Sequence, residues 1–582
     1  MGHGHRDACS RRMFLTRAAL AVPLASPLAS PLLGIASAAA SPRPVRDGAS
    51  ARATEYRADL VIIGGGLGGC AAALAAARHG LRVIMTEETD WIGGQLTQQG
   101  VPPDENAWIE SIGGTRSYLS FRAAVRAFYR QQRPLTVAAR SQPRLNPGNG
   151  WVSRLCAEPR VFLAVLEDTL APYVASGQLT ILRQHRAVAA DVSGDTVRAV
   201  ELRAEADGSR VVVRAPWFAD ATELGELLPL TRTEYVTGAE SRAQTGEPHA
   251  KATPEPDNVQ GFTVCFAMDY RPDRSAIIDQ PPAYAFWRDL ALDPPPGEPR
   301  TRLLSFDDAG SKRIGFDPVR RTGFWSYRRI IDHTHFVPGH HDHDVTIVNW
   351  GQNDYSFGSL IDVPPEVAAT HVRRAKELGL SLLYWLQTEA PRPDGGVGWP
   401  GLGLRRDILG TDDGFAKYPY IRESRRIAAE VTVREQQITV EARLRDTGLA
   451  RAVVAATPFA DSVGIGHYSL DLHRTTRGDR GQYGDTLPFQ IPLGALLPQR
   501  MENLLPAAKN LGVTHLTNGC YRLHPIEWNI GESVGALVAF CTAQHCSPRA
   551  VRHTPALLAD FQTLLERDGV RLAWPSPLPA PR

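Results

Sequence analysis

Residues 59–87 read DLVIIGGGLGGCAAALAAARHGLRVIMTE, and this stretch decides the fold. An apolar run leads into a G-x-G-x-x-G turn at Gly64, Gly66 and Gly69, and an alanine-rich segment follows the turn. A second apolar run then ends at Glu87. Strand, glycine turn, helix, strand and acid in this order are the fingerprint of a βαβ unit that binds a dinucleotide.

Each part of the fingerprint has a physical role. Gly64 permits the tight turn, Gly66 lets the backbone approach a pyrophosphate, and Gly69 lets helix and strand pack closely. The helix N-terminus then faces the phosphates, and Glu87 is placed to accept a hydrogen bond from a ribose hydroxyl. A chance glycine-rich turn is the alternative, but strand, helix and acid occur in register, so we predict a bound dinucleotide.

Length and composition bound the remaining possibilities. A chain of 582 residues predicts two domains or one large discontinuous domain. Hydrophobic content of 43% and charged content of 22% are ordinary for a soluble globular protein. The formal net charge is +2, and no block of Lys and Arg is long enough for a nucleic-acid stripe, so no nucleic-acid partner is expected.

The first forty residues read as an export signal. Arg11 and Arg12 lie in a twin-arginine pattern, an Ala/Leu/Pro region follows, and small residues around Ala38 offer a cleavage site. A membrane anchor is the competing interpretation, but prolines interrupt the apolar run. We predict removal of residues 1–40 and a periplasmic or secreted mature protein without a membrane span.

Capping and turn signals divide the rest of the chain. Helices are expected from Arg116 to about Arg130, from Pro159, and from Pro365. The expected strands are residues 179–184, 187–192, 196–203, 210–214, 259–269, 345–350 and 430–444. The predicted domains are the signal (1–40), a linker (41–57), a dinucleotide-binding domain in two parts (58–229 and 490–548), a substrate or cap domain (230–489), and a C-terminal helix with a frayed tail (549–582).

The order of the elements separates two kinds of dinucleotide-binding protein. A nicotinamide-dependent dehydrogenase continues with further βαβ units, whereas here a β-meander leads into an acid-rich turn at Asp220 and Glu223. This order resembles the glutathione-reductase-type FAD proteins and implies FAD as the cofactor. A second glycine turn, at Gly94 and Gln95, follows the ribose acid directly and is expected to line the cofactor.

From residue 58 to residue 545 the sequence resembles the FAD-dependent oxidoreductase family, which is grouped with the fumarate reductase and glutathione reductase flavoproteins. The motifs that carry the resemblance are residues 64–87, 220–226, 420–426, 461–473 and the closing segment from residue 502. The resemblance implies an α/β fold. It combines a Rossmann-like FAD-binding domain of the glutathione reductase type, with its β-meander, and a mixed α+β substrate or cap domain.

The resemblance also implies site residues in the closing segment. In the family the final helix points its N-terminus at the flavin, which would place the amides near Gly531 and Glu532 against the negative charge of the reduced ring. Some relatives attach the flavin covalently through a histidine in the second glycine turn. This chain has glutamines there, so we expect non-covalent FAD.

Four side chains are candidates for the chemistry. Arg522 and His524 lie just upstream of the expected flavin-facing amides, where the substrate should lie. His524 is expected to accept a proton, because imidazole titrates near neutrality, and Arg522 to orient the substrate. His467 and His473 are further candidate bases, although a core or surface histidine is the favoured interpretation of each taken singly.

Three arginines are candidate substrate-binding residues: Arg116, Arg422 and Arg425. A guanidinium fork fits the two oxygens of a carboxylate or phosphate. An interdomain salt-bridge lattice with Glu423 and Glu430 is an equally open interpretation of Arg422 and Arg425, and of the neighbouring Arg426.

Three sharper interpretations are disfavoured. Ser533 lies in a G-x-S-x-G string, but no acid followed by a histidine comes after it, as a hydrolase triad of that type requires. The histidine-rich residues 332–344 could ligate zinc or copper, but such loops are more often solvated turns, so no metal is predicted. Cys541 and Cys546 could pair after export, although isolated thiols are favoured.

The sequence therefore predicts an exported FAD-dependent oxidoreductase that takes a hydride from a small-molecule substrate. Only one complete fingerprint is present, so oxygen or a respiratory carrier is favoured over a nicotinamide as electron acceptor. The alternatives are a non-catalytic flavin-binding or ligand-binding protein, and a flavoenzyme without net redox such as an isomerase. Substrate identity and oligomeric state are not readable from the sequence.

Overall fold

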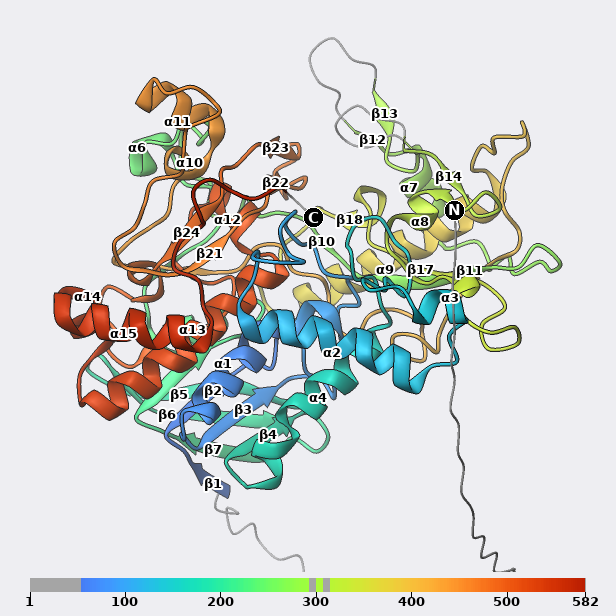
Figure 1. The fold of residues 1–582 in the computed structure, drawn as a ribbon. Coiled ribbons are helices and arrows are strands. Elements are labelled where there is room, and N and C mark those ends of the chain that lie inside the picture. The colour runs from blue at the N-terminus through green and yellow to red at the C-terminus, as the bar shows by residue number, and fades with distance from the viewer. Residues whose placement is uncertain (1–53, 293–299, 307–313, 581–582) are drawn as a thin grey trace, which may run out of the picture. The chain divides into compact units, whose positions relative to one another are not determined.

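The computed structural model describes residues 54–292, 300–306 and 314–580 (Figure 1). The predicted signal peptide, residues 1–40, lies outside the described residues, and so does the linker as far as residue 53. The described residues belong to one compact unit, and the division into domains stays a prediction.

A parallel sheet of five strands carries the glycine fingerprint. Its order is β25 (Leu504–Pro506), β8 (Trp217–Asp220), β2 (Leu60–Ile63), β3 (Val83–Glu87) and β4 (Leu179–Arg183). β2 and β3 are buried along their whole length, as strands of a parallel sheet covered on both faces should be. The predicted Rossmann-like unit is confirmed, and the closing segment supplies the edge strand β25.

Two helices lie side by side on this sheet (Figure 1). α1 (Leu67–Arg78) follows the glycine turn, and α13 (His524–Gln544) comes from the closing segment. Glycine permits their close approach, because a Cβ at Gly531 would lie 1.9 Å from the carbonyl oxygen of Gly68. The small residues of α1 and α13 therefore allow the two helices to pack this closely.

The predicted β-meander consists of β5 (His185–Ser193), β6 (Thr196–Ala204) and β7 (Arg210–Arg214), paired antiparallel. β1 (Thr54–Arg57) pairs parallel with β7 and adds a fourth strand. The sequence expectation placed residues 54–57 in a linker. All four side chains of β1 are exposed, so this edge strand carries no apolar pattern that would reveal it.

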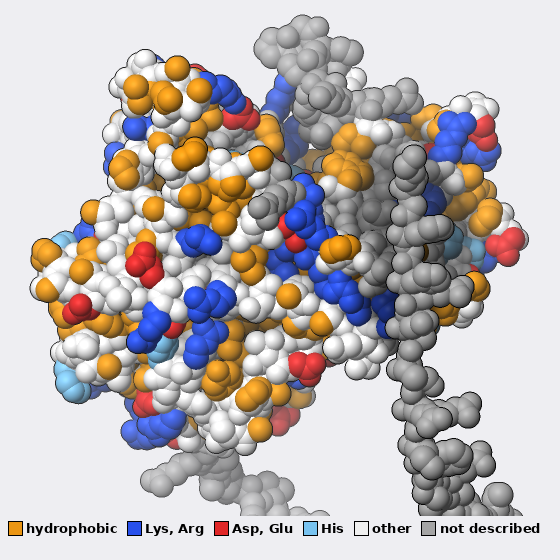
Figure 2. Space-filling view, in the orientation of Figure 1, with side chains coloured by type: hydrophobic (Ala, Val, Ile, Leu, Met, Phe, Trp, Pro, Cys, Tyr) orange, Lys and Arg blue, Asp and Glu red, His pale blue; other side chains and the backbone are white. Residues whose placement is uncertain are grey.

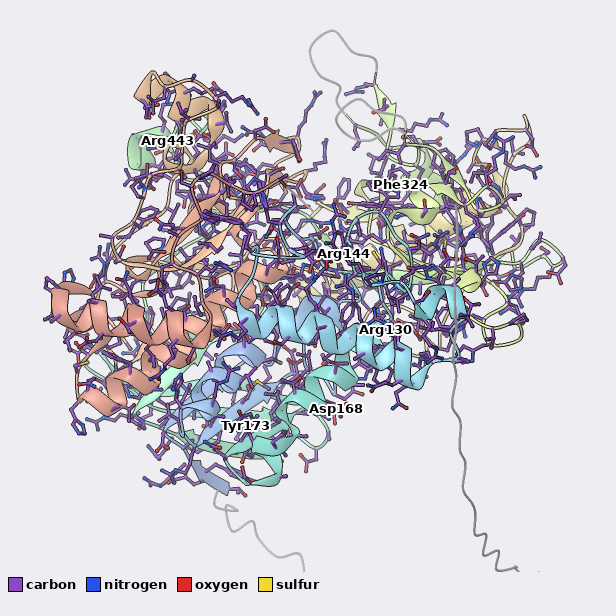
Figure 3. All side chains as sticks on the ribbon, in the orientation of Figure 1. Arg130, Arg144, Asp168, Tyr173, Phe324 and Arg443 are labelled. Atoms are coloured by element: carbon purple, nitrogen blue, oxygen red, sulfur yellow. The ribbon has the colours of Figure 1, made fainter. Side chains whose placement is uncertain are left out.

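Two helices of 17 residues each, α2 (Arg116–Gln132) and α4 (Pro159–Ala175), pack near the glycine fingerprint. α2 begins after Thr115, whose hydroxyl accepts a hydrogen bond from a first-turn N–H, and α4 begins with its proline in the first turn. Both starts agree with the prediction. Figure 3 labels one residue of α2 and two of α4: Arg130, Asp168 and Tyr173.

A second sheet lies in the middle third of the chain. Its order is β16 (Arg329–Ile331), β17 (Val345–Val348), β11 (Phe266–Tyr270) and β19 (Leu402–Leu404), and its pairings are antiparallel. The predicted long helix, α9 (Pro365–Thr388), buries an apolar face in the same core. This part is the mixed α+β region that the sequence predicted.

The predicted strand at residues 430–444 is wrong. Residues 430–444 do not form a strand, because two helices, α10 (Glu435–Ile438) and α11 (Val440–Thr447), occupy most of that segment. Gly448, in the left-handed region at φ +66°, ends the second of them. The β-branched residues of this run suggested a strand, but helix capping decides the local structure.

The C-terminal tail is anchored by hydrogen bonds, although residues 575–580 are exposed. It follows two helices, α14 (Pro548–His553) and α15 (Pro555–Asp568). The indole N–H of Trp574 donates to the carbonyl oxygen of Phe489 at 3.0 Å. These contacts are with distant parts of the chain, which local sequence signals do not report.

The remaining elements are short. They are η1 (Gly94–Leu96), α3 (Val137–Arg140), α5 (Leu227–Thr231), β9 (Tyr235–Val236), α6 (Arg242–Thr245), β10 (Phe262–Thr263), α7 (Tyr284–Asp289), β12 (Ala291–Leu292), β13 (Thr301–Arg302), β14 (Phe316–Asp317), β15 (Thr322–Gly323), α8 (Phe324–Tyr327), η2 (His333–His335), η3 (Gly351–Asn353), β18 (Asp354–Tyr355), β20 (Arg426–Ile427), β21 (Ser462–Gly466), β22 (Leu470–Leu472), β23 (Gln482–Gly484), β24 (Phe489–Pro492), η4 (Leu493–Leu496) and α12 (His515–Tyr521).

The surface agrees with the near-neutral composition. The face in Figure 2 carries basic and acidic side chains with hydrophobic ones between them. Among the described residues, no helix is both long and apolar enough to cross a membrane. The six cysteines within the described ranges are free, Cys541 and Cys546 included.

Candidate functional site

The glycine fingerprint lines a small cavity of about 30 Å³. Gly64 and Gly66 line it from the fingerprint, Glu87 from the end of β3, Ala187 from the meander and Thr222 from the turn after β8. The cavity thus lies at the carboxyl ends of the parallel strands, where open α/β sheets bind their ligands.

At each of the three fingerprint glycines a side chain would be strained or would come too close to the backbone or to Glu223. Gly64 has a φ of +102°, and a Cβ there would lie 2.3 Å from the carbonyl oxygen of Ala221. A Cβ at Gly69 would lie 2.1 Å from the Gly64 carbonyl oxygen, and one at Gly66 would lie 3.0 Å from Glu223 Oε1. The cradle is therefore shaped by the absence of side chains, as a pyrophosphate site requires.

Glu87 is held on the cavity wall by three donors. Its Oε2 accepts from the N–H of Gly65 at 3.1 Å, and its Oε1 accepts from the N–H of Thr89 at 2.8 Å and from Gln98 Nε2 at 2.9 Å. Burial raises the pKa of Glu87 to about 7, against the effect of these hydrogen bonds. A carboxyl oriented in this way can accept from a ribose hydroxyl.

The second glycine turn packs directly on the first. The N–H of Gly93 donates to the Gly65 carbonyl oxygen at 2.7 Å, and Gly94 has a φ of +53°. At the end of this turn Gln99 is fully buried, and both of its amide atoms lack a partner. A buried amide without partners calls for a ligand or water, so the residues present fit a polar cofactor here.

Three ionisable groups are buried together against the fingerprint: Glu223, Lys509 and Glu527. Together with Gln95 we call them the loop cluster. The Lys509 ammonium contacts Glu223 Oε2 and lies 3.8 Å from Glu527 Oε2. Gln95 Nε2 donates to Glu527 Oε2 and, at 3.0 Å, to the Arg522 carbonyl oxygen. The loop cluster therefore joins both glycine turns to the closing segment.

The charges of the loop cluster are uneven, with two carboxyls for one ammonium. Burial raises the pKa of Glu527, although Lys509 opposes that rise. Burial would lower the pKa of Lys509, but Glu223 and Glu527 outweigh it and the pKa is raised. Glu223 Oε1 is buried without a partner, so the loop cluster can still accept a hydrogen bond.

Asp220 has a positioning role. Its Oδ1 accepts from the N–H of Thr222 at 3.0 Å and from the same residue's hydroxyl at 2.7 Å, while Oδ2 accepts from the N–H of Leu227 at 3.2 Å. Burial raises the pKa of Asp220 to about 6. With its oxygens engaged, Asp220 shapes the turn that carries Glu223.

The closing helix begins earlier than the sequence suggested. α13 starts at His524, so Gly531 and Glu532 lie two turns inside it and their amides are engaged within the helix. Gly531 contacts α1, and Glu532 accepts from the Ser117 hydroxyl at 2.6 Å. The expectation that these amides face the flavin is therefore corrected, because Pro525 starts the helix at His524.

His524 has the chemistry of a donor. Its Nδ1 accepts from the N–H of Asp104 at 3.0 Å, which places the proton of the neutral ring on Nε2. Nε2 is buried without a partner, and burial lowers the pKa of His524 to about 3. The geometry thus corrects the expected general base, since Nδ1 is blocked and Nε2 already carries the proton.

A second buried network, the arginine cluster, brings together three of the predicted residues and two acids: Arg522, His473, Arg422, Asp471 and Asp354. Asp471 Oδ2 lies 3.2 Å from Arg522 Nη2 and 3.4 Å from His473 Nε2. Asp354 contacts His473 Nδ1 at 2.5 Å and Arg422 Nη2 at 2.9 Å. His473 therefore links two aspartates, each of which is paired with an arginine.

The network fixes charges on its members. Burial and Arg422 lower the pKa of His473, but Asp354 and Asp471 outweigh them and the pKa is raised. Burial alone would raise the pKa of Asp354, but Arg422 and His473 bring it down to about 2. The side chain of His473 is 27% exposed, so this cationic ring connects the buried network to solvent.

His467 and Arg116 lie outside both clusters. His467 packs edge-on against Trp108 with ring centroids 5.2 Å apart, and burial lowers its pKa. Arg116 is exposed and donates to the carbonyl oxygen of Arg567 at 3.1 Å. Their partners, Trp108 and Arg567, belong to neither cluster, so the proposed site does not include His467 or Arg116.

Arg422 and Arg425, the two candidate arginines of residues 420–426, have different roles. Arg425 pairs with Asp362 at 2.7 Å and donates to the Leu224 carbonyl oxygen at 2.8 Å. It therefore forms a salt bridge, but its partner is Asp362 and not Glu423 or Glu430. Arg422 belongs instead to the arginine cluster, and its Nε is buried without a partner. Only Arg422 stays a candidate for contact with substrate.

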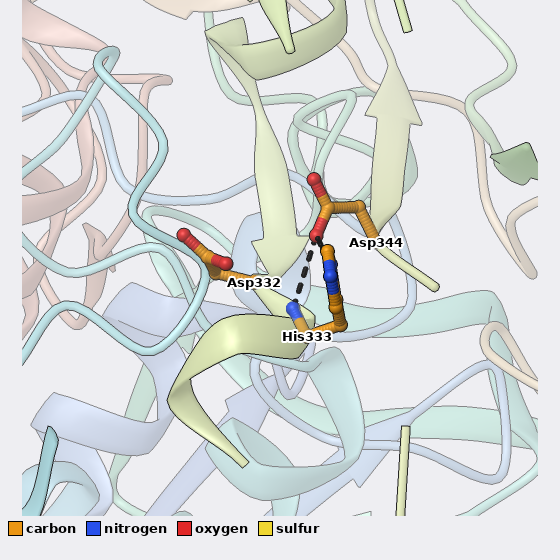
Figure 4. A group of neighbouring side chains, drawn as sticks. All are labelled: Asp332, His333 and Asp344. Carbon is orange, nitrogen blue, oxygen red and sulfur yellow. Dashed lines mark hydrogen bonds and ion pairs between the residues drawn. The ribbon is translucent and has the colours of Figure 1, made fainter. Parts of the chain in front are cut away.

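The structure does not favour the hydrolase or the metal interpretation of the sequence. Ser533 is buried in the middle of α13, where its hydroxyl donates to the Val463 carbonyl oxygen at 2.8 Å, and it is not on a strand-to-helix elbow. Asp332, His333 and Asp344 lie together within the histidine-rich loop (Figure 4). Two arginines, Arg321 and Arg329, pair with both aspartates and offset the charge that would attract a cation.

Sequence reasoning missed four members of these clusters: Asp354, Asp471, Lys509 and Glu527. Lys509 is one of only five lysines in the chain, and a rare lysine beside an expected cofactor strand was a usable signal. Asp471 precedes the predicted His473 by two positions. Asp354 and Glu527 carried no signal, because only the folded chain brings them to their partners.

The fold and the site together define an α/β flavoenzyme with a glutathione-reductase-type arrangement of dinucleotide site and β-meander. The chain belongs to the FAD dependent oxidoreductase family, whose model matches residues 59–565. It is accordingly an FAD-dependent oxidoreductase, and the residues that line the cavity are those that would hold FAD.

The chain also resembles individual proteins, either over a short segment or at low sequence identity. A soluble pyridine nucleotide transhydrogenase from Hahella chejuensis (strain KCTC 2396) is 45% identical over 51 residues, which are 9% of this chain and 11% of that protein. Among solved structures, E. coli quinol fumarate reductase is 10% identical with a TM-score of 0.29, covering 88% of this chain and 74% of its own. A geranylgeranyl bacteriochlorophyll reductase-like protein from Thermoplasma acidophilum is 12% identical with a TM-score of 0.29, covering 89% of this chain and 85% of its own.

Proposed function

We propose that this oxidoreductase works outside the cytoplasm and takes a hydride from a carbon of a small-molecule substrate. FAD, held without a covalent bond, supplies the hydride acceptor, and oxygen or another external acceptor removes the electrons. The arginine cluster, next to the start of α13, is the observation that carries this proposal. Buried charge of this kind is costly to maintain, and it is characteristic of sites where charge develops during a reaction.

The unpartnered atoms around α13 support a substrate with acceptor oxygens. Arg522 Nε, Arg422 Nε and His524 Nε2 are all buried without partners, and all three carry hydrogen-bond donors. Arg522 and Arg422 orient the substrate in this proposal, and His524 donates from Nε2.

The proton that accompanies the hydride needs a separate acceptor. His473 in its neutral form takes that proton and releases it to water, because its ring is partly exposed and lies between two aspartates. Asp354 and Asp471 hold the ring in place. The rate of substrate oxidation should then rise with pH through the pKa of His473.

An anaerobic donor screen tests the proposal. Purified protein is mixed with alcohols, hydroxy acids, amines and sugars without oxygen, and bleaching of the yellow flavin is recorded. At least one class should bleach it. If no donor bleaches the flavin, the protein binds FAD without oxidising these substrates. Turnover without any acceptor identifies the isomerase alternative.

Two further experiments test the mode of binding and the location. Acid precipitation should release all of the yellow colour into the supernatant, and colour retained in the pellet would show a covalent flavin. Replacing Arg11 and Arg12 by Lys should hold the precursor in the cytoplasm with FAD bound. Normal export of that variant would argue for another route.

A further inference from the structure

The loop cluster occupies the place where the pyrophosphate of FAD must arrive. After a G-x-G-x-x-G turn the pyrophosphate lies on the N-terminus of the following helix, here α1. One amide of that first turn is already engaged, because the N–H of Gly68 donates to Glu527 Oε1 at 3.3 Å. Glu527 thus competes with the phosphates for the same end of the helix.

A second carboxyl stands on the other side of the cradle. Glu223 lines the cavity, and its unpartnered Oε1 lies 3.0 Å from the position of a Cβ on Gly66 and 2.9 Å from that of one on Gly94. It therefore lies between the two glycine turns. Its charge, like that of Glu527, would repel the two negative charges of a pyrophosphate.

The surroundings offer little to offset this repulsion. The groups that face Glu527 are Lys509 after β25, Glu223 after β8, Gln95 in η1, and the Gly68 amide with Cys70 on α1. Lys509 is the one cation in that set, and it is shared between the two carboxyls. Binding an anionic cofactor there leaves an uncompensated buried carboxylate, unless a proton neutralises it.

We propose that FAD binds together with one proton, which is taken up by Glu527. The protonated carboxyl releases the Gly68 amide to the pyrophosphate and can itself donate to a phosphate oxygen, while Lys509 offsets the phosphate charge. No bond is made or broken other than the O–H bond of the Glu527 carboxyl. The proposal concerns cofactor loading and does not depend on which substrate is oxidised.

Linkage gives the sign and size of the effect. Below the pKa of Glu527 in the apoprotein, the carboxyl is protonated with or without FAD and contributes no pH dependence. Above that pKa, uptake of one proton weakens FAD binding by about tenfold for each pH unit. Burial raises the pKa of Glu527 from its ordinary value, so the weakening begins above the range of an exposed glutamate.

Glu87 lines the same cavity and burial raises its pKa to about 7, so the wild-type profile alone does not identify the titrating group. The test therefore compares two proteins. Apoprotein of the wild type and of Glu527→Gln is titrated with FAD between about pH 5 and about pH 9, and Kd is read from flavin fluorescence. The amide keeps the size and hydrogen-bonding oxygen of the carboxyl but does not titrate. The ratio of wild-type to variant Kd should grow by about tenfold per pH unit at the alkaline end.

Calorimetry supplies an independent readout. FAD binding measured in two buffers of different ionisation enthalpy gives the protons taken up, and Glu527→Gln should take up about one fewer than the wild type. Glu247→Gln is the matched control, because Glu247 is a buried glutamate whose pKa burial raises to about 7 in a different pocket. It should keep the wild-type profile.

Parallel pH profiles for wild type and Glu527→Gln, or equal proton uptake, would overturn the proposal. If Glu527→Gln fails to fold by circular dichroism, Glu527→Met replaces it, since this side chain also fills the site without titrating. A Glu247→Gln profile that loses the same slope would likewise overturn the assignment to Glu527.

Discussion

The loop cluster and the arginine cluster are both buried ionic networks, but acidic groups are in excess in the first and basic groups in the second. The loop cluster has two carboxyls and one ammonium, whereas the arginine cluster has two carboxylates, two guanidiniums and an imidazole with a raised pKa. The sign of the charge in excess indicates what kind of group each cluster can still bind. The loop cluster needs positive charge before it can hold an anionic cofactor, and the arginine cluster is ready for a negatively charged or electron-rich substrate group.

Their connections to solvent also differ. Lys509 and Glu527 are fully buried, while His473 of the arginine cluster is 27% exposed. A proton that enters the loop cluster is therefore trapped by the cofactor that follows it. A proton that reaches His473 can leave on each turnover.

The largest expected effect is the loss of FAD from the loop cluster, with the arginine cluster left intact. Gly66→Val should give colourless protein, because the branched side chain would lie against Glu223 and occupy the path of the pyrophosphate. Absorbance of the purified protein measures this. Yellow Gly66→Val protein with normal FAD content would mean that the cofactor does not cross this turn.

Lys509→Met should be the most destabilising change within the loop cluster. It leaves two buried carboxyls without their cation, and such losses cost about 3–5 kcal/mol. Urea unfolding of the apoprotein measures the change in the free energy of unfolding. Lys376→Met is the control, because that lysine pairs with Asp413 at the surface, where a pair contributes about 0–1 kcal/mol.

The fold could be predicted where local signals decide it. Thr115 and Pro159 start their helices by capping and by proline geometry, and the 64–87 stretch has the full period of a βαβ unit. At residues 430–444 the β-branched residues indicate a strand, but the segment forms helices and Gly448 ends the second of them. Local composition decides less than capping in that segment.

The site could be predicted only in part, because it depends on contacts between distant residues. The glycines, Glu87 and Arg522 follow from motifs. Lys509 and Glu223 are 286 positions apart, and His473 and Asp354 are 119 apart, so no spacing rule connects them. The start of α13 was also misplaced, since the helix begins at a histidine and a proline rather than at the glycines.

A smaller effect concerns the pH dependence of stability. The pKa of His473 is raised in the folded protein, so its stabilising contribution is complete below its unfolded value of about 6.5 and is lost as pH rises through the folded value. The difference in unfolding free energy between wild type and His473→Gln should therefore shrink from about pH 6 to about pH 9. A difference that grows with pH would mean that the ring is neutral between its two aspartates.

The smallest expected effect distinguishes His524 from a base. Its pKa is lowered to about 3, so His524 contributes no titration near neutrality. The pH profile of flavin reduction should keep the same midpoint in His524→Gln, while the rate falls. Loss of the midpoint in that variant would restore His524 as the titrating base.

The most direct test of the division of labour between the clusters is one measurement on Arg522→Met. FAD affinity and the rate of anaerobic flavin reduction are determined on the same preparation, with a donor found by screening and with Arg477→Gln as a surface control. The account predicts FAD affinity within about threefold of wild type and reduction slowed by about 10²- to 10³-fold, the usual cost of losing one charge-stabilising donor. Wild-type reduction with FAD bound would contradict it, because the arginine cluster would then have no part in the chemistry.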